Sequence, residues 1–385
     1  MQFAFTDEQE QFRSVVRRFL TAKSPTTEVR RLMASADGFD PLVWQQLASD
    51  LALPGIHLPE AYGGAGFGAV ELNIAMEEQG RALLCAPYFS SCVLAASAML
   101  HAGTEEQKAR LLPGIASGQC RAALALTEAS GRWDMDAIQT VARRDASADG
   151  GWRIDGAKRF VIDGCTADAL VVAARISGQA GDAGIGLFWL AADAQGVARV
   201  PLATMDATRK QAGIQFNGAT AELLGPAELL GHEGVGARAL ARTLDDAAIA
   251  LAGEMIGGAE ALLESAVAYA NMRVQFGRAI GSFQAIKHKC ADMLLDVELA
   301  KSAVYYAAQA QADGDPETPG LACLAKAAAS DAYMRTATQT IQIHGGIGFT
   351  WDNDTHLWFK RAKSSEVLLG DPNYHRELML QRLEA

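Results

Sequence analysis

The spacing of hydrophobic residues changes twice along this chain, and this change constrains the fold more than any other feature of the sequence. Up to about residue 119, and again after about residue 232, apolar residues recur every three to four positions, as on one face of an α-helix. Between residues 120 and 232 they form short alternating runs broken by Gly, Asp and Asn, which is typical of an antiparallel β domain. The sequence therefore predicts a mostly α-helical α+β protein with three domains: an N-terminal helical domain at 1–119, a central antiparallel β domain at 120–232 and a C-terminal helical bundle at 233–385.

Local signals place the helices within the two helical domains. The first helix is predicted to begin at a capping box, with Thr6 as the N-cap and Gln9 as the third helical residue. Further helical patterns of the first domain cover 41–51, 70–83, 91–101 and 104–115. In the last domain, alanine-rich segments at about 237–272, 282–312 and 320–344 predict long, closely packed antiparallel helices. The clearest loop is predicted at 313–320, where the sequence is DGDPETPG.

The charge of the chain excludes two classes of partner. There are 34 basic and 45 acidic residues, which gives a net charge of −11 and disfavours nucleic acid and anionic membrane surfaces. The first twelve residues, MQFAFTDEQEQF, carry acids where a targeting signal has basic residues. No apolar run approaches the roughly 18 residues that a membrane span needs. We therefore expect a cytoplasmic protein.

The cysteines indicate neither disulfides nor a metal site. They are scattered along the chain without CxxC pairs or nearby histidines at metal-ligand spacing. The six are Cys85, Cys92, Cys120, Cys165, Cys290 and Cys323. Reduced and mostly buried thiols are expected.

A doubly wound nucleotide-binding fold is the main alternative architecture, and it is disfavoured. That fold requires a strand, a G-x-G-x-x-G turn and a helix in succession. The richest glycine cluster, residues 63–68, follows prolines rather than a strand. Its Gly66-x-Gly68 pair is followed by Glu71 where the third glycine should be.

Two stretches near the C-terminus closely resemble the acyl-CoA dehydrogenase family. The first runs from RVQFG at 273–277 through IGSFQ at 280–284 to Met293, and the second is QIHGGIGF at 342–349. LPEAYGG at 58–64 and ALTE at 125–128 are weaker matches. The resemblance covers the whole chain in the order helical, β, helical.

This resemblance implies that the chain binds the pyrophosphate and adenosine half of an FAD whose flavin lies in a neighbouring subunit. A guanidinium fork suits a diphosphate, and adjacent glycines let backbone amides approach an anion. The implied residues are Arg273, Phe276, Gln284, Gln342, Gly345 and Gly346. Taken singly, Arg273 is also consistent with capping a helix C-terminus, and the two glycines with an ordinary turn. A homodimer, a homotetramer or a complex with a related acyl-CoA dehydrogenase subunit follows from the resemblance.

The resemblance assigns the flavin half of the cofactor to the β domain. Thr127 matches a threonine that family members place near the flavin, and Phe160 matches a position where they usually have tryptophan. By β-propensity alone, both residues are also ordinary strand residues.

The catalytic base that the resemblance predicts is missing. The family reaction removes the α-proton of an acyl thioester with a glutamate while hydride leaves the β-carbon for flavin N5. The two positions that match the family's glutamates are Leu369 and Ala247. The positions matching a flavin-bonding threonine and a substrate-contacting serine are Ile162 and Trp133, which cannot replace those hydrogen bonds.

Three carboxylates near the vacant positions are substitute candidates. Asp246 adjoins Ala247, but one residue along a helix turns a side chain by about 100°. Glu366 is also consistent with a solvated helix residue, and Asp371, before Pro372, with a helix N-cap. Asp246 is the preferred candidate for the base.

Three functions remain open at this stage. The first is an FAD-dependent acyl-CoA dehydrogenase that desaturates an acyl-CoA and passes electrons to an electron-transfer flavoprotein or a similar acceptor. The second is a non-catalytic subunit that completes the FAD site of a related partner. The third keeps the fold but changes the chemistry, as in oxidase or desulfinase action.

Overall fold

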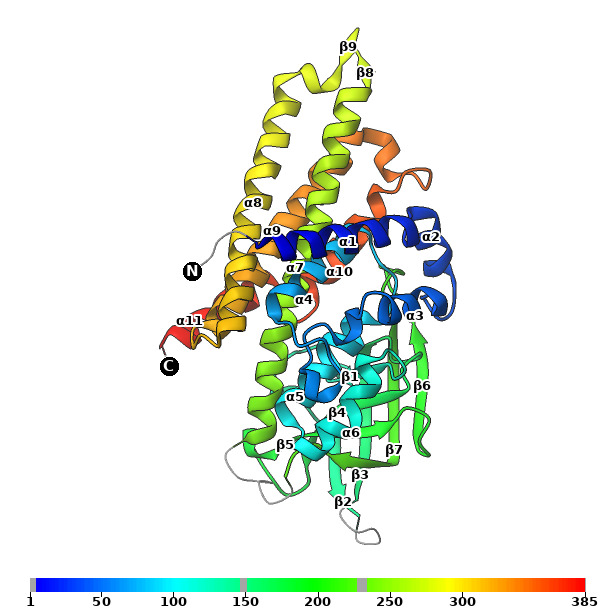
Figure 1. Ribbon diagram of the computed structural model, residues 1–385, viewed down its shortest axis with the longest axis vertical. Coiled ribbons are helices and arrows are strands. Elements are labelled where there is room, and N and C mark those ends of the chain that lie inside the picture. Colours follow the sequence, from blue (N-terminus) through cyan, green and yellow to red (C-terminus); the bar gives the residue numbers. More distant parts are fainter. Residues whose placement is uncertain (1–4, 146–150, 227–233, 385) are drawn as a thin grey trace. The chain divides into compact units, whose positions relative to one another are not determined.

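The computed structural model describes residues 5–145, 151–226 and 234–384, which form two compact units (Figure 1). The helical unit lies within Met1–Leu32, Ala69–Cys85 and Ala248–Ala385, and the β unit within Met33–Gly68 and Ala86–Ala247. The predicted N-terminal helices are thus divided between the two units. The domain boundary predicted at 119 stays a prediction, and the one at 232 lies outside the described residues.

The helical unit is built on long helices that pack lengthwise. Its helices are α1 (Asp7–Lys23), α2 (Thr26–Ala34, up to residue 32), α4 (Ala69–Arg81), α7 (Val235–Met272, from residue 248), α8 (Gln284–Asp313), α9 (Thr318–His344), α10 (Thr355–Val367) and α11 (Pro372–Glu384). The three long alanine-rich helices are confirmed as α7, α8 and α9, and Figure 1 shows α8 and α9 side by side. The capping box at the start of α1 is also confirmed, since Thr6 and Gln9 bond each other's backbone N–H.

Close approach of α4 and α7 depends on glycine. A Cβ atom on Gly80 would lie 1.8 Å from the carbonyl oxygen of Glu254, and one on Gly257 would lie 1.8 Å from that of Glu77. Near this crossing, Arg361 of α10 donates to the buried Glu254 carboxylate at 2.8 Å. The small residues therefore permit a tight crossing, next to which a buried ion pair joins α7 to α10.

The loop predicted at 313–320 is too long at both ends, so its predicted bounds are wrong. Helix α8 runs through Asp313 and stops at Gly314, which has a φ of 67°, and α9 already begins at Thr318. Pro319 lies in the first turn of α9, where its missing N–H costs nothing. The proline that suggested a loop is therefore part of a helix start.

Among the described residues, the β unit has seven strands and three α-helices in addition to the first part of α7. The strands are β1 (Ala122–Ala125), β2 (Val141–Arg144), β3 (Trp152–Ile162), β4 (Ala169–Ile176), β5 (Ile185–Ala191), β6 (Val197–Leu202) and β7 (Gln211–Leu223). The helices are α3 (Pro41–Ser49), α5 (Ala96–Ala102) and α6 (Glu105–Ala116). A π-helical turn at Phe89–Ala95 precedes α5, so the helix predicted at 91–101 is α-helical only in its second half.

The strands close on themselves around an apolar core. The order β4–β2–β3–β7–β5 returns to β4, because β4 also pairs with β5, while β1 and β6 add to β4 and β7. Most pairs are antiparallel, as predicted, but β1 and β2 run parallel to β4. Parallel pairing needs long connections between the strands, which the alternation of single strands does not reveal. In the described part of the chain, no helix is long and apolar enough to cross a membrane.

Candidate functional site

The tip of the helical unit is a short β-hairpin that presents Arg273 and Phe276. Helix α7 ends at Met272, and β8 (Val274–Gln275) pairs with β9 (Arg278–Ala279) across Phe276 and Gly277. Both turn residues have positive φ, at 54° and 75°, as a type I′ hairpin turn requires. The ring of Phe276 is 92% exposed, and Figure 1 shows the hairpin projecting from the ends of α7 and α8.

The Arg273 side chain is exposed, and no described residue pairs with its guanidinium. Its backbone is fixed, because its N–H donates to the carbonyl of Tyr269 and its own carbonyl accepts from Ile280, both at 2.8 Å. Gln284 is the exposed first residue of α8. The hydrogen-bonded backbone thus holds the Arg273 guanidinium where it can bind an anion from outside this unit.

The end of α9 carries Gln342, Gly345 and Gly346. Gln342 and both glycines are exposed, and Gly345 closes the helix with a φ of 67° and a ψ of −145°, a conformation open essentially only to glycine. A Cβ atom at either glycine would meet nothing within 4 Å. The backbone of this turn is therefore accessible to a ligand.

Packing brings this turn to the same end of the helical unit as the hairpin. The ring of His344 stacks on Tyr269 of α7, with 4.2 Å between the ring centroids. Ile343 shares a buried cluster with Ala270 of α7 and Met293 of α8. The residues that the sequence linked to the adenosine half of FAD, from three separate segments, therefore gather at one end of the unit.

In the β unit, Thr127 and Phe160 are connected through Arg159. The Thr127 hydroxyl donates to the carbonyl of Arg159 at 2.6 Å, and the Arg159 N–H donates to the carbonyl of Thr127 at 2.9 Å. Phe160 has a φ of 60° and lies in a bulge where β3 loses register with β7. The bulge leaves the Phe160 ring partly exposed on the surface of the sheet.

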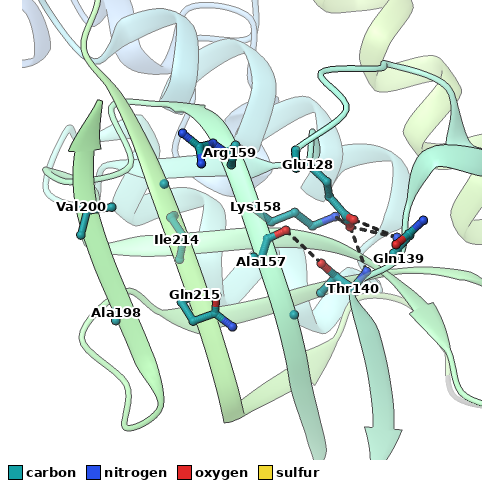
Figure 2. Close-up of a pocket in the computed structure, with 13 residues that line it drawn as sticks. Glu128, Gln139, Thr140, Ala157, Lys158, Arg159, Ala198, Val200, Ile214 and Gln215 are labelled. Atoms are coloured by element: carbon teal, nitrogen blue, oxygen red, sulfur yellow. Dashed lines mark hydrogen bonds and ion pairs between the residues drawn. The ribbon is translucent and has the colours of Figure 1, made fainter. Parts of the chain in front are cut away.

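A hollow of about 570 Å³ opens over β3, β6 and β7 (Figure 2), and some of its wall residues are sequence neighbours of Thr127 and Phe160. Glu128 and Arg159, the neighbours of Thr127 and Phe160, line it, although Thr127 and Phe160 themselves do not. Its other walls include Ala198, Val200 and Gln215. The sequence did not predict this hollow, because its walls come from strands that pair far apart in the chain.

An ion pair between the buried Lys158 and the half-buried Glu128 lines one side of the hollow. The Lys158 ammonium lies 2.8 Å from the Glu128 carboxylate, which also accepts hydrogen bonds from the backbone N–H groups of Gln139 and Thr140. Figure 2 draws these contacts as dashed lines. Burial lowers the pKa of Lys158 to about 8, although Glu128 opposes this shift. Burial would raise the pKa of Glu128, but the charge of Lys158 and the hydrogen bonds hold it below its ordinary value. These two residues have each other as partners and fix the wall of the hollow.

The two positions expected to carry a glutamate are apolar and closed. Ala247 in α7 is fully buried. Leu369, after α10, is also buried and has a φ of 63°. Its loop is held by two side chains: Lys326 donates to the carbonyls of Glu366 and Gly370, and His375 contacts the carbonyl of Leu369.

The Asp246 side chain contacts a residue that the sequence did not predict as its partner. Its carboxylate lies 2.7 Å from Nε2 of His101, in the last turn of α5. The His101 and Asp246 side chains are 26% and 18% exposed. The two residues are 145 positions apart, so no local pattern links them.

The other substitute carboxylates are engaged locally. Glu366 forms an ion pair with Lys363 one turn earlier, and Asp371 accepts the N–H of Tyr374 at the start of α11. Ile162 is buried at the end of β3, and Trp133 is half-buried.

Comparison with known proteins identifies the family of the chain. Models of the acyl-CoA dehydrogenase N-terminal, middle and C-terminal domains match residues 6–119, 123–219 and 234–384. The acyl-CoA dehydrogenase IpdE2 of Mycobacterium tuberculosis is 35% identical, over 98% of this chain and 97% of that protein.

Two solved structures are similar over the whole length. Butyryl-CoA dehydrogenase from Megasphaera elsdenii superposes with a TM-score of 0.91 and 29% identity, covering 100% of both chains. A chain of the ChsE4–ChsE5 complex of Mycobacterium tuberculosis superposes with a TM-score of 0.87 and 26% identity, covering 100% of this chain and 99% of that chain.

Proposed function

The chain belongs to the acyl-CoA dehydrogenase family, and from this premise we propose that it is an FAD-dependent dehydrogenase that introduces an α,β double bond into an acyl-CoA thioester. One observation carries the proposal: Arg273, Gln342 and the Gly345–Gly346 turn gather, exposed, at one end of the helical unit.

The residues at this end fit the diphosphate and adenosine of FAD. The Arg273 guanidinium has no partner among the described residues, so it retains all its donors for a bidentate contact with phosphate. The open space at Gly345 and Gly346 permits close approach of an anion to the backbone. Phe276, Gln284 and Gln342 would complete the site as apolar and amide contacts.

The β unit fits the flavin less completely. Thr127 and Phe160 stand next to the hollow walls, and the Thr127 hydroxyl oxygen can still accept a hydrogen bond while it donates to Arg159. Ile162 offers no hydrogen bond at the matching threonine position. The hydrogen bonds to the flavin would then come from Thr127 and from backbone groups of the β unit.

When bound, FAD supplies the acceptor for the hydride that leaves the β-carbon of the acyl group. This chain must then supply a base for the α-proton, and the carboxylate nearest to the family's helix position is Asp246. The electrons would pass to an electron-transfer flavoprotein or a similar acceptor.

The exposed tip also supports assembly with a second subunit. The apolar side chains of Met272, Val274 and Phe276 are exposed beside Arg273, as are Phe349 and Trp351 after the glycine turn. Apolar surface of this kind marks an interaction site. A homodimer or homotetramer, or a complex with a related subunit, would cover it.

A second function is favoured by Ala247 and Leu369, which leave both family positions without a carboxylate. In this alternative the chain is a non-catalytic subunit that completes the FAD site of a partner. The ChsE4–ChsE5 structure, a complex of two named components, supports such an arrangement.

The test is purification of the protein alone, identification of any bound flavin, and anaerobic mixing with short, long and ring-bearing acyl-CoAs. The proposed dehydrogenase carries FAD, and its flavin absorbance bleaches with at least one acyl-CoA. A purified, folded protein that takes up no FAD would contradict the proposal.

A further inference from the structure

The contact between His101 and Asp246 suggests a different base from a lone carboxylate. We infer that His101, oriented by Asp246, accepts the α-proton of the acyl thioester. This inference rests on the proposed dehydrogenase function.

The hydrogen bond defines which ring nitrogen is basic. A carboxylate only accepts hydrogen bonds, so Asp246 at 2.7 Å selects the tautomer of His101 that carries its proton on Nε2. Nδ1 then keeps the lone pair. The same carboxylate stabilises the imidazolium that forms when Nδ1 takes a proton, as in other carboxylate–histidine pairs.

Asp246 and His101 are more accessible than Ala247 at this turn of α7. Ala247 is fully buried, while its neighbour Asp246 and the facing His101 are 18% and 26% exposed. A glutamate is absent at Ala247, and the imidazole that contacts the neighbouring Asp246 supplies a titratable group that the apolar position lacks.

A second histidine near this pair does not compete for the proton. Both ring nitrogens of His57 are buried and have no hydrogen-bond partner among the described residues. Burial lowers the pKa of His57 to about 4, despite the nearby charge of Asp246. His57 therefore stays neutral near pH 7.

The proton step balances without an oxidant. The α C–H bond breaks, a proton bonds to Nδ1 of His101, and the electron pair stays on the thioester as its enolate. The Asp246 carboxylate keeps its hydrogen bond to Nε2 throughout. In D₂O the imidazolium exchanges its proton with solvent and returns a deuteron to the α-carbon, so the base can be assayed apart from hydride transfer.

The experiment measures α-deuterium incorporation into butyryl-CoA by the FAD-bound protein in D₂O, by mass spectrometry. His101→Ala and His101→Gln should lower the exchange rate by about 10²- to 10⁴-fold, with an unchanged Kd for butyryl-CoA. Asp246→Asn should also lower it strongly, because an amide stabilises neither the tautomer nor the imidazolium. Added imidazole should restore part of the exchange in His101→Ala but not in Asp246→Asn. Asp50→Asn, at the exposed end of α3, is the matched carboxylate control and should exchange like the wild type.

Two results would overturn the inference. Wild-type exchange in folded His101→Ala and His101→Gln, with loss only in Asp246→Asn, would make Asp246 itself the base. No exchange by the wild type would mean that the pair is not a base at all. The outcomes separate the two proposals: exchange through His101 without flavin bleaching by any acyl-CoA would contradict the dehydrogenase function alone. Bleaching that survives both His101 variants would contradict this inference alone.

Discussion

Two regions of α7 and its surroundings have opposite character. At the tip, Arg273 and Phe276 are exposed on a rigid hairpin, beside a glycine turn with open space around its backbone. At Ala247, and at Leu369 after α10, the side chains are apolar and buried. Both regions match family positions, but only the tip keeps the residue types that we propose to hold FAD. We therefore propose that this chain keeps its cofactor-binding elements while the usual catalytic glutamate is absent.

The largest of these effects is expected from placing a carboxylate at the buried position 247. In a His101→Ala background, Ala247→Glu should raise the rate of flavin reduction by roughly 10²-fold, because it restores general-base catalysis. Stopped-flow absorbance of the flavin measures this rate. Ala247→Gln is the control of equal size without a base, and Leu369→Glu is a second variant if the first does not fold. Equal rates in the folded Ala247→Glu and Ala247→Gln variants would show that position 247 does not face the reacting thioester.

The loop that holds Leu369 gives a prediction about pH. Burial lowers the pKa of Lys326 from 10.5 to about 7, so the unfolded chain binds its proton more tightly than the folded protein does. Because of Lys326, the free energy of unfolding is highest above pH 10.5. It decreases as the pH drops from 10.5 toward 7, by on the order of a few kcal/mol. Lys326→Met should remove this slope in urea unfolding measured across that range. A slope identical to that of the wild type would mean that Lys326 is charged in the folded protein.

At the tip, Arg273→Ala should weaken FAD binding by about 1.5–3 kcal/mol, the contribution typical of hydrogen bonds to a charged group. The Kd for FAD, from fluorescence titration of the apoprotein, measures this loss. Arg335→Ala, which removes an exposed arginine paired with Asp296, is the matched control. Equal FAD affinity in the two variants would show that Arg273 does not bind the diphosphate of FAD.

The smallest effect is expected in the β unit. Thr127→Val removes the hydrogen bond to the Arg159 carbonyl and should lower the free energy of unfolding by about 1 kcal/mol. It should also shift the flavin absorbance if Thr127 borders the ring. A loss of stability with an unchanged flavin spectrum would make Thr127 purely a sheet residue.

Features set by near neighbours in sequence were predictable, and features set by distant pairing were not. The capping box at Thr6 and the extent of α7 follow from local spacing and appear as expected. The closure of the sheet depends on the pairing of β3 with β7 and of β2 with β4, strands far apart in the chain, which no alternation pattern specifies. His101 was missed for the same reason, since its partner Asp246 lies 145 residues away. Pro319 misled the loop prediction, because proline both ends helices and begins them.

The most direct test of the account is a single-turnover comparison of the flavin in the protein alone and in the protein co-expressed with a relative that carries the family glutamate. The account predicts that the protein alone bleaches its FAD with an acyl-CoA, and that His101→Ala abolishes this bleaching. The contradicting result is a protein whose FAD stays oxidised on its own with every acyl-CoA and bleaches only in the complex, independently of His101. That result would make this chain the non-catalytic subunit.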